Sequence, residues 1–262
     1  MAVPRISARR ALNRHARATG AFEGPFSAKL AAWLTRFGRL LADEAIEEMG
    51  LLSKSHARVV AKASIWELLK SDLHNLFFGF GMRSMQRAGE RATGAKWQVP
   101  PLMQQQFAEQ KQVLLQGLMD DTREAARESV RVIIQEATVA DVKRSPQEIA
   151  RRIRRQFHGP ANGRQELFSP ERAELIARTE LVQSQNSGTA AALEEAGVEE
   201  IEWVAFTDGK SGDRHHERMH GKRIQVGGMF ETPLGNRLRY PGDPRGPIKE
   251  TARCRCGIKP VI

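Results

Sequence analysis

Before residue 200, hydrophobic residues recur at the three- and four-residue spacing of amphipathic helices. One such stripe runs between Ser27 and Gly50, which are typical residues for the start and the end of a helix. A second stripe leads to Phe77, and a third begins at Leu102. Apolar stripes of this kind usually form core contacts, so they predict a helical bundle or a long helical hairpin over residues 27–140.

Two further helices are predicted after this region. Ser145-Pro146-Gln147-Glu148 is a capping box with proline at the first helical position, which favours a helix that ends near His158. Ser169-Pro170 opens a second helix, which continues to Gly197. The segment from His158 to Gln165 between these helices is polar and turn-forming, so we expect a boundary there.

After Gly197 the pattern changes to short apolar runs between glycine and proline turns. These runs predict four strands: Ile201–Phe206, Lys222–Val226, Arg237–Tyr240 and Cys256–Pro260. The fold class predicted is therefore α+β and predominantly α-helical. A helical N-terminal region is followed by a small C-terminal α+β module with a short β-sheet over residues 141–262.

Residues 1–26 form a basic segment without apolar periodicity, and Gly20, Gly24 and Pro25 interrupt it. We therefore predict a basic N-terminal arm with at most a short helix. No apolar stretch follows its arginines as in a secretory signal, and no run approaches the ~18 residues of a membrane span. The expectation is a soluble protein made in the cytoplasm.

Charge points to anionic partners, because the formal net charge is +10 and the isoelectric point is near 10.1. The candidate contacts with DNA or an acidic protein surface are arginines of the arm and of the predicted helix after Ser145: Arg9, Arg10, Arg151, Arg152, Arg154 and Arg155. A merely solvated basic face is the alternative. Aromatic residues make up only 6% of the chain, so base-specific recognition is not expected.

The last third of the chain contains an ordered series of short motifs. They are Ile176-Ala177-Arg178-Thr179-Glu180, Asn186, Trp203, Asp208, Arg214, His216, Gly221, Tyr240-Pro241-Gly242-Asp243-Pro244, Pro247, Glu250, Cys254-Arg255-Cys256 and Pro260. In this order and spacing they resemble the phage Mu protein F-like family of minor head proteins, over roughly residues 140 to 262. This family is also called the phage head-morphogenesis family.

The resemblance implies a structural minor head protein of a tailed bacteriophage or prophage, made in the host cytoplasm. It would act in head morphogenesis and reside in the virion, in the head interior or at the portal vertex. Its partners would be the portal protein and major capsid or scaffold subunits, with non-specific contact to packaged double-stranded DNA as a further expectation. No enzymatic activity is expected.

Two other functions stay open. The first is a DNA-binding protein that is carried in the head and delivered with the genome. The second is a metal-dependent nuclease in which Asp208, Asp213 and nearby histidines hold a catalytic ion. The sequence contains no established nuclease spacing and no glycine-rich phosphate loop, so we expect catalysis least.

The resemblance also implies a structural zinc site, because many relatives carry Cys-x-x-Cys where this chain has histidines. A cysteine pair that faces Cys-x-Cys is typical of tetrahedral zinc. The ligands would be His216, Cys254 and Cys256, with Asp213 or His220 as the fourth. Alternatively, the cysteines are small buried residues and the histidines belong to a solvated loop.

The remaining motif residues are interpreted as structural. Arg178 and Glu180 lie on a predicted helix, where charge-assisted hydrogen bonds would anchor the loops of the module. Pro241, Gly242 and Asp243 belong to a run that favours a rigid turn. Many relatives carry asparagine where this chain has Arg253, so details that depend on that position are not transferred.

Overall fold

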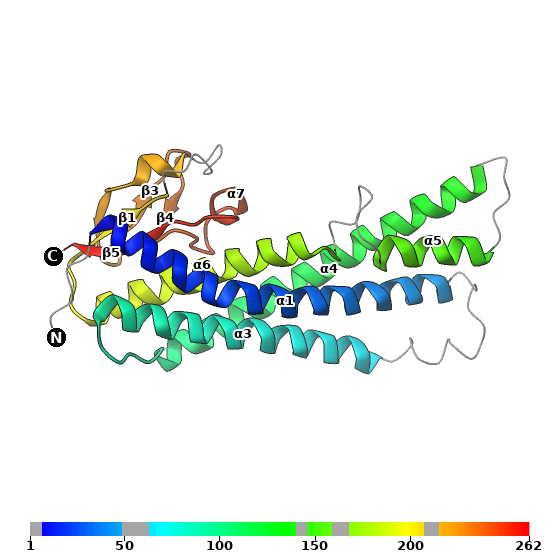
Figure 1. Cartoon of the computed structure of the whole chain (residues 1–262), viewed down its shortest axis with the longest axis horizontal. Coiled ribbons are helices and arrows are strands. Elements are labelled where there is room, and N and C mark those ends of the chain that lie inside the picture. The colour runs from blue at the N-terminus through cyan, green and yellow to red at the C-terminus, as the bar shows by residue number, and fades with distance from the viewer. Residues whose placement is uncertain (1–6, 49–62, 140–145, 159–167, 207–214, 262) are drawn as a thin grey trace. The chain divides into compact units, whose positions relative to one another are not determined.

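A computed structural model of the chain describes residues 7–48, 63–139, 146–158, 168–206 and 215–261. Long helices make up most of it (Figure 1): α1 Ala8–Glu48, α3 Ala63–Thr93, α4 Pro101–Val139, α5 Pro146–His158 and α6 Pro170–Glu195. The C-terminal part adds β1 Glu200–Val204, a 3₁₀ helix His216–Met219, β2 Arg223–Gln225, β3 Phe230–Glu231, β4 Arg237–Leu238, α7 Ile248–Thr251 and β5 Gly257–Val261. The predicted fold class is confirmed.

The sheet is small and antiparallel. β1 is its central strand, in the order β2-β1-β5, and β3 pairs with β4 in a separate hairpin. Glu202 on β1 lies opposite Arg223 on one neighbour and Lys259 on the other, and it forms ion pairs with both, at 3.2 and 3.1 Å. Opposite charges across neighbouring strands favour this register. A central strand buried along most of its length suits the apolar run seen in the sequence.

The structure differs from the prediction of an N-terminal arm, because α1 begins at Ala8 and is continuous through Pro25. Proline lacks the amide proton that an inner helical turn donates, so this position weakens the helix. Burial compensates, since Ala18, Phe22 and Phe26 are all in the core. Phe26 packs on Phe80 of α3, with ring centroids 4.9 Å apart.

The described residues fall into two compact units, each built from separate stretches of chain. One contains residues 1–27, 77–107 and 175–262, and the other contains residues 28–76 and 108–174. This grouping differs from the three consecutive segments that the sequence predicts, because long helices contribute to both units. None of the described helices combines the length and the apolar character needed to cross a membrane.

The second unit is held by aromatic packing and by ion pairs between helices. Trp33 donates a hydrogen bond to the carbonyl oxygen of Leu69 at 2.9 Å, which links α1 to α3. Phe37 packs edge-on against Trp66, with ring centroids 5.6 Å apart. Arg123 of α4 pairs with Glu44 of α1. These contacts pack α1 against α3 and α4 within this unit.

The first unit contains the sheet and its core. Trp203 of β1 is fully buried, and its ring lies 5.1 Å from that of Phe230. Helix α6 approaches α3 closely at Gly188, where a Cβ atom would lie 2.4 Å from the carbonyl oxygen of Met85. Only glycine permits this approach of two backbones. This contact fixes α6 beside α3.

Candidate metal centre

Four side chains meet in the core of the C-terminal module. His216 comes from the start of the 3₁₀ helix, Glu250 from α7, and Cys254 and Cys256 from the segment between α7 and β5. A left-handed backbone at His215 (φ 54°) and another at Arg253 (φ 58°) precede the two ligand-bearing segments. Such conformations turn the chain sharply. The result is that four residues from three segments are brought together.

The imidazole of His216 lies between a carboxylate and the thiols. Its Nε2 is 2.6 Å from Oε2 of Glu250, and its Nδ1 is 3.7 Å from Sγ of Cys254. One ligand atom each from His216, Cys254 and Cys256 lies within 4.8 Å of the other two. The exposed fraction is 1% for His216, 0% for Glu250 and 5% or less for the cysteines. The cluster is therefore closed off from solvent.

The carboxylate of Glu250 is saturated with partners. Its Oε1 accepts hydrogen bonds from the Thr232 hydroxyl at 2.7 Å and from the Asn236 amide at 2.8 Å. Thr232 and Asn236 flank the turn between β3 and β4, where Gly235 adopts a φ of 76°. A buried carboxylate is tolerated only with such compensation. Glu250 thus ties the hairpin turn to α7 and orients the ring of His216.

The pKa values follow from this arrangement. Burial lowers the pKa of His216, but hydrogen bonds and charge attraction from Cys256 and Glu250 outweigh it and raise the pKa. Burial raises the pKa of Glu250, but Thr232, Asn236 and His216 lower it below its usual value. A hydrogen bond from Cys254, aided by His216, holds the pKa of the Cys256 thiol well below its usual range. The cluster therefore favours a thiolate.

This donor set fits a zinc ion. Thiolate sulfur and imidazole nitrogen are the usual ligands, at about 2.3 and 2.0 Å from the metal, which places neighbouring ligand atoms roughly 3.5 to 3.8 Å apart in a tetrahedron. The 3.7 Å between His216 Nδ1 and Cys254 Sγ is of that size. Histidine ligands commonly donate their second nitrogen to a carboxylate, which is the position that Glu250 occupies.

The fourth ligand suggested by the sequence is not part of this group among the described residues. His220 is exposed, and its Nδ1 accepts a hydrogen bond from the amide of Ala205 at 3.3 Å. Asp208, Asp213 and Arg214 lie outside the described residues. His215 is also exposed, with its Nδ1 3.4 Å from Glu217.

Asn186 is one of the residues through which α6 holds the module. Its buried side-chain amide donates to the carbonyl oxygen of Pro241 at 2.8 Å and to that of Cys256 at 2.9 Å. Two loops far apart in sequence are thus fixed to one helical position. Arg178 instead forms an ion pair with Glu23 of α1, through Nε at 2.9 Å and Nη2 at 2.5 Å. Arg178 therefore has a structural contact with α1.

The other motif residues shape turns. Gly221 and Gly242 have φ values of 81° and 76°, which glycine adopts most readily. The Asp243 carboxylate is buried and accepts hydrogen bonds from the backbone amides of Arg239 and Arg245, at 3.0 and 3.1 Å. Glu180 is also buried, on α6. The rigid turn predicted around Pro241 is consistent with these contacts.

Fold and site together define a largely helical protein whose C-terminal α+β module closes around a buried carboxylate–imidazole–thiol cluster. Residues 133–259 match the family described as Phage Mu protein F like protein, which is just under half of the 262 residues and includes the whole cluster. The resemblance predicted from the motifs is confirmed for this segment. No curated protein and no solved structure matched the chain. The family points to phage head morphogenesis and to a structural rather than an enzymatic role.

The role of Glu250 predicts a large effect on stability. Glu250→Ala leaves the imidazole of His216, the hydroxyl of Thr232 and the amide of Asn236 without their buried acceptor. It should lower the free energy of unfolding by about 3–5 kcal/mol in urea denaturation. Glu250→Gln keeps an acceptor oxygen and should cost less.

The matched control is Glu231→Ala, which removes an exposed carboxylate from the same module. It should change stability by no more than about 0.5 kcal/mol. If the two alanine variants lowered the free energy of unfolding equally, the structural role of Glu250 would be contradicted.

Proposed function

We propose that this chain is a structural minor head protein of a tailed bacteriophage or prophage, acting in head morphogenesis near the portal vertex. The observation that carries the proposal is the Mu F-like match, because residues 133–259 include α6, β1 to β4, the start of β5 and the buried cluster. The proposed partners are the portal protein and major capsid or scaffold subunits. The proposed location is the virion, in the head interior or at the portal vertex.

The geometry of the cluster supports a structural role. His216, Glu250 and both cysteines are buried, so a polymer such as DNA has no direct access to them. Their contacts instead connect the 3₁₀ helix, the β3–β4 turn and α7. Groups arranged in this way hold a small module in one conformation, which suits a protein that is built into an assembly. This arrangement gives no support to the nuclease alternative.

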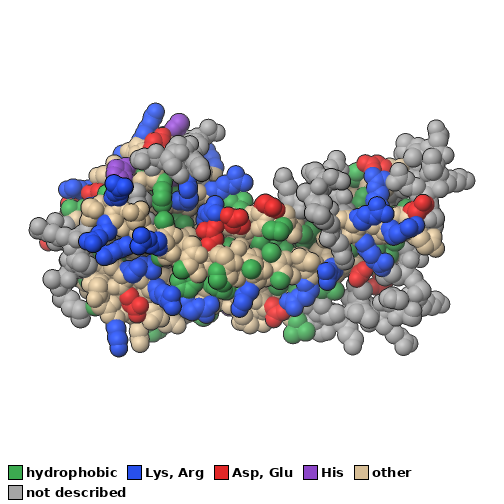
Figure 2. Space-filling model, in the orientation of Figure 1, with side chains coloured by type: hydrophobic (Ala, Val, Ile, Leu, Met, Phe, Trp, Pro, Cys, Tyr) green, Lys and Arg blue, Asp and Glu red, His purple; other side chains and the backbone are tan. Residues whose placement is uncertain are grey.

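A DNA-binding protein delivered with the genome is the second candidate. The supporting observation is that Arg9 and Arg10 are exposed on α1 and that Arg151 and Arg155 are exposed on α5. On the face shown in Figure 2, Lys and Arg side chains gather around the start of α1 and the nearby strands.

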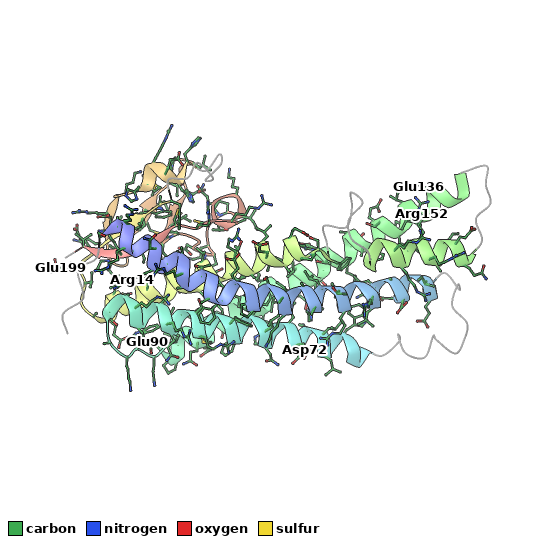
Figure 3. All side chains as sticks on the ribbon, in the orientation of Figure 1. Arg14, Asp72, Glu90, Glu136, Arg152 and Glu199 are labelled. Carbon is green, nitrogen blue, oxygen red and sulfur yellow. The ribbon has the colours of Figure 1, made fainter. Side chains whose placement is uncertain are left out.

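Part of the charge on α5 is neutralised within its own unit. Arg152 forms an ion pair with Glu136 of α4, and the two side chains lie next to each other in Figure 3. Arg154 lies 3.6 Å from the carboxylate of Asp43 on α1. These pairs reduce the charge available for phosphate contacts, so we rank DNA binding below the structural role.

We also propose that Cys254, Cys256 and His216 hold a structural zinc ion, with Glu250 supporting His216. Zinc would link the C-terminal segment to the 3₁₀ helix and stabilise a module with a small core. Asp213 is the remaining candidate for the fourth ligand.

Removing zinc should destabilise the chain. Protein purified without chelator is expected to contain about one zinc ion per chain by elemental analysis and to melt at a lower temperature after chelation. The Cys254→Ser variant should also lose the metal and have a lower melting temperature. In chelated samples the same substitution should have a much smaller effect, because the metal bond is already gone. A metal-free chain with identical melting curves in both conditions would end the zinc proposal.

The head assignment is tested by crosslinking mass spectrometry on purified particles of the source phage or prophage. We expect the chain in the particles, with crosslinks from the start of α1 or from α5 to portal or major capsid subunits. Absence from particles would contradict the proposal. Salt-sensitive DNA binding by a chain that is absent from particles would instead favour the second candidate.

A further inference from the structure

A cavity of about 500 Å³ lies in the first unit, and none of the four cluster residues lines it. Its walls come from α1, from α6 and from the segment around Cys254, and three of its lining residues are Arg178, Arg253 and Arg255. Cavities of this size commonly bind ligands. Neither the family match nor the proposed metal centre assigns any role to this cavity.

The backbone of Arg253 is unusual. Its φ of 58° lies in the left-handed region, which disfavours residues with a long side chain. The conformation is held by a hydrogen bond from the Arg253 amide to the Thr179 hydroxyl on α6, at 3.3 Å. Glycine or asparagine would occupy this position with less strain. Residues with strained backbone conformations cluster at functional sites, and Arg253 lies in the wall of a cavity.

The cavity has a positive balance of charge. Arg178 is paired with Glu23, which also lines the cavity, whereas the guanidinium of Arg253 forms no ion pair within the described part of the chain. Arg255 is stacked over the Phe206 ring at 5.2 Å. His15 contributes no charge near pH 7, because burial and the nearby Arg91 lower its pKa to about 4.

We propose that this cavity binds a carboxylate group presented by an acidic peptide segment of another protein. Guanidinium groups match the planar shape of a carboxylate and bind it through paired hydrogen bonds. The side chains of Phe206 and Val182 add apolar contacts that suit a peptide.

A peptide fits the cavity better than duplex DNA does. The phosphates of duplex DNA lie on a stiff, wide cylinder and are usually bound by cations spread over an open surface. In contrast, one side chain of an extended peptide can enter a cavity with walls from three elements. The inference rests on this chemistry alone, so its failure would leave the head assignment untouched.

The test uses the full chain and a fluorescein-labelled peptide of alternating glutamate and glycine, followed by fluorescence anisotropy. Arg253→Asn removes the charge and keeps a residue suited to the left-handed backbone, so it should weaken peptide binding roughly ten-fold. The matched control is Arg237→Asn, which removes one exposed charge elsewhere in the module and should leave affinity within about two-fold. A peptide with glutamine in place of glutamate should not bind.

Melting temperature separates lost binding from lost folding. The melting temperature of Arg253→Asn should equal or exceed that of the unaltered chain, because the substitution relieves backbone strain. Equal weakening by both variants, or equal binding of the glutamine peptide, would overturn the proposal. The proposal would also be overturned if Arg253→Asn weakened the binding of labelled duplex DNA but left peptide binding unchanged. The cavity would then be a nucleic-acid contact.

Discussion

The C-terminal module depends on the buried contact between the carboxylate of Glu250 and the imidazole of His216. Neither side chain has access to water, so each needs the other to offset the cost of desolvation. Glu250 also accepts hydrogen bonds from Thr232 and Asn236, and this fixes its carboxylate in one orientation. Four residues from three short elements are therefore interdependent, and a module with few strands gains a defined core.

This pair also determines the chemistry of the site. With Nε2 of His216 directed at Glu250, the opposite ring nitrogen faces Cys254. The thiols, the imidazole and the supporting carboxylate match the donor set of the structural zinc centre that we propose. Asn186 adds a second support from α6, because its amide holds the carbonyl group of Cys256. A helix, a turn and the last strand are thus connected through one group of buried residues.

The sequence predicts much of this arrangement, and the failures have physical reasons. Four of the five described strands could be predicted because glycine and proline turns delimit short apolar runs, whereas the two-residue strand β3 was not predicted. The resemblance identified His216 and the two cysteines. The first half of α1 could not be predicted, because its many arginines and Pro25 interrupt the apolar periodicity to which Phe22 and Phe26 belong. The roles of Glu250 and Arg253 depend on contacts between distant segments and on a backbone angle, which periodicity does not encode.

X-ray absorption at the zinc edge of the purified chain would show which atoms surround the metal. We expect two sulfur neighbours at about 2.3 Å and at least one imidazole nitrogen at about 2.0 Å. The sulfur signal should diminish in Cys256→Ser. A first shell of oxygen and nitrogen atoms alone, or a chain that takes up no zinc when zinc is supplied, would contradict the claim that the Glu250–His216 pair positions a metal site.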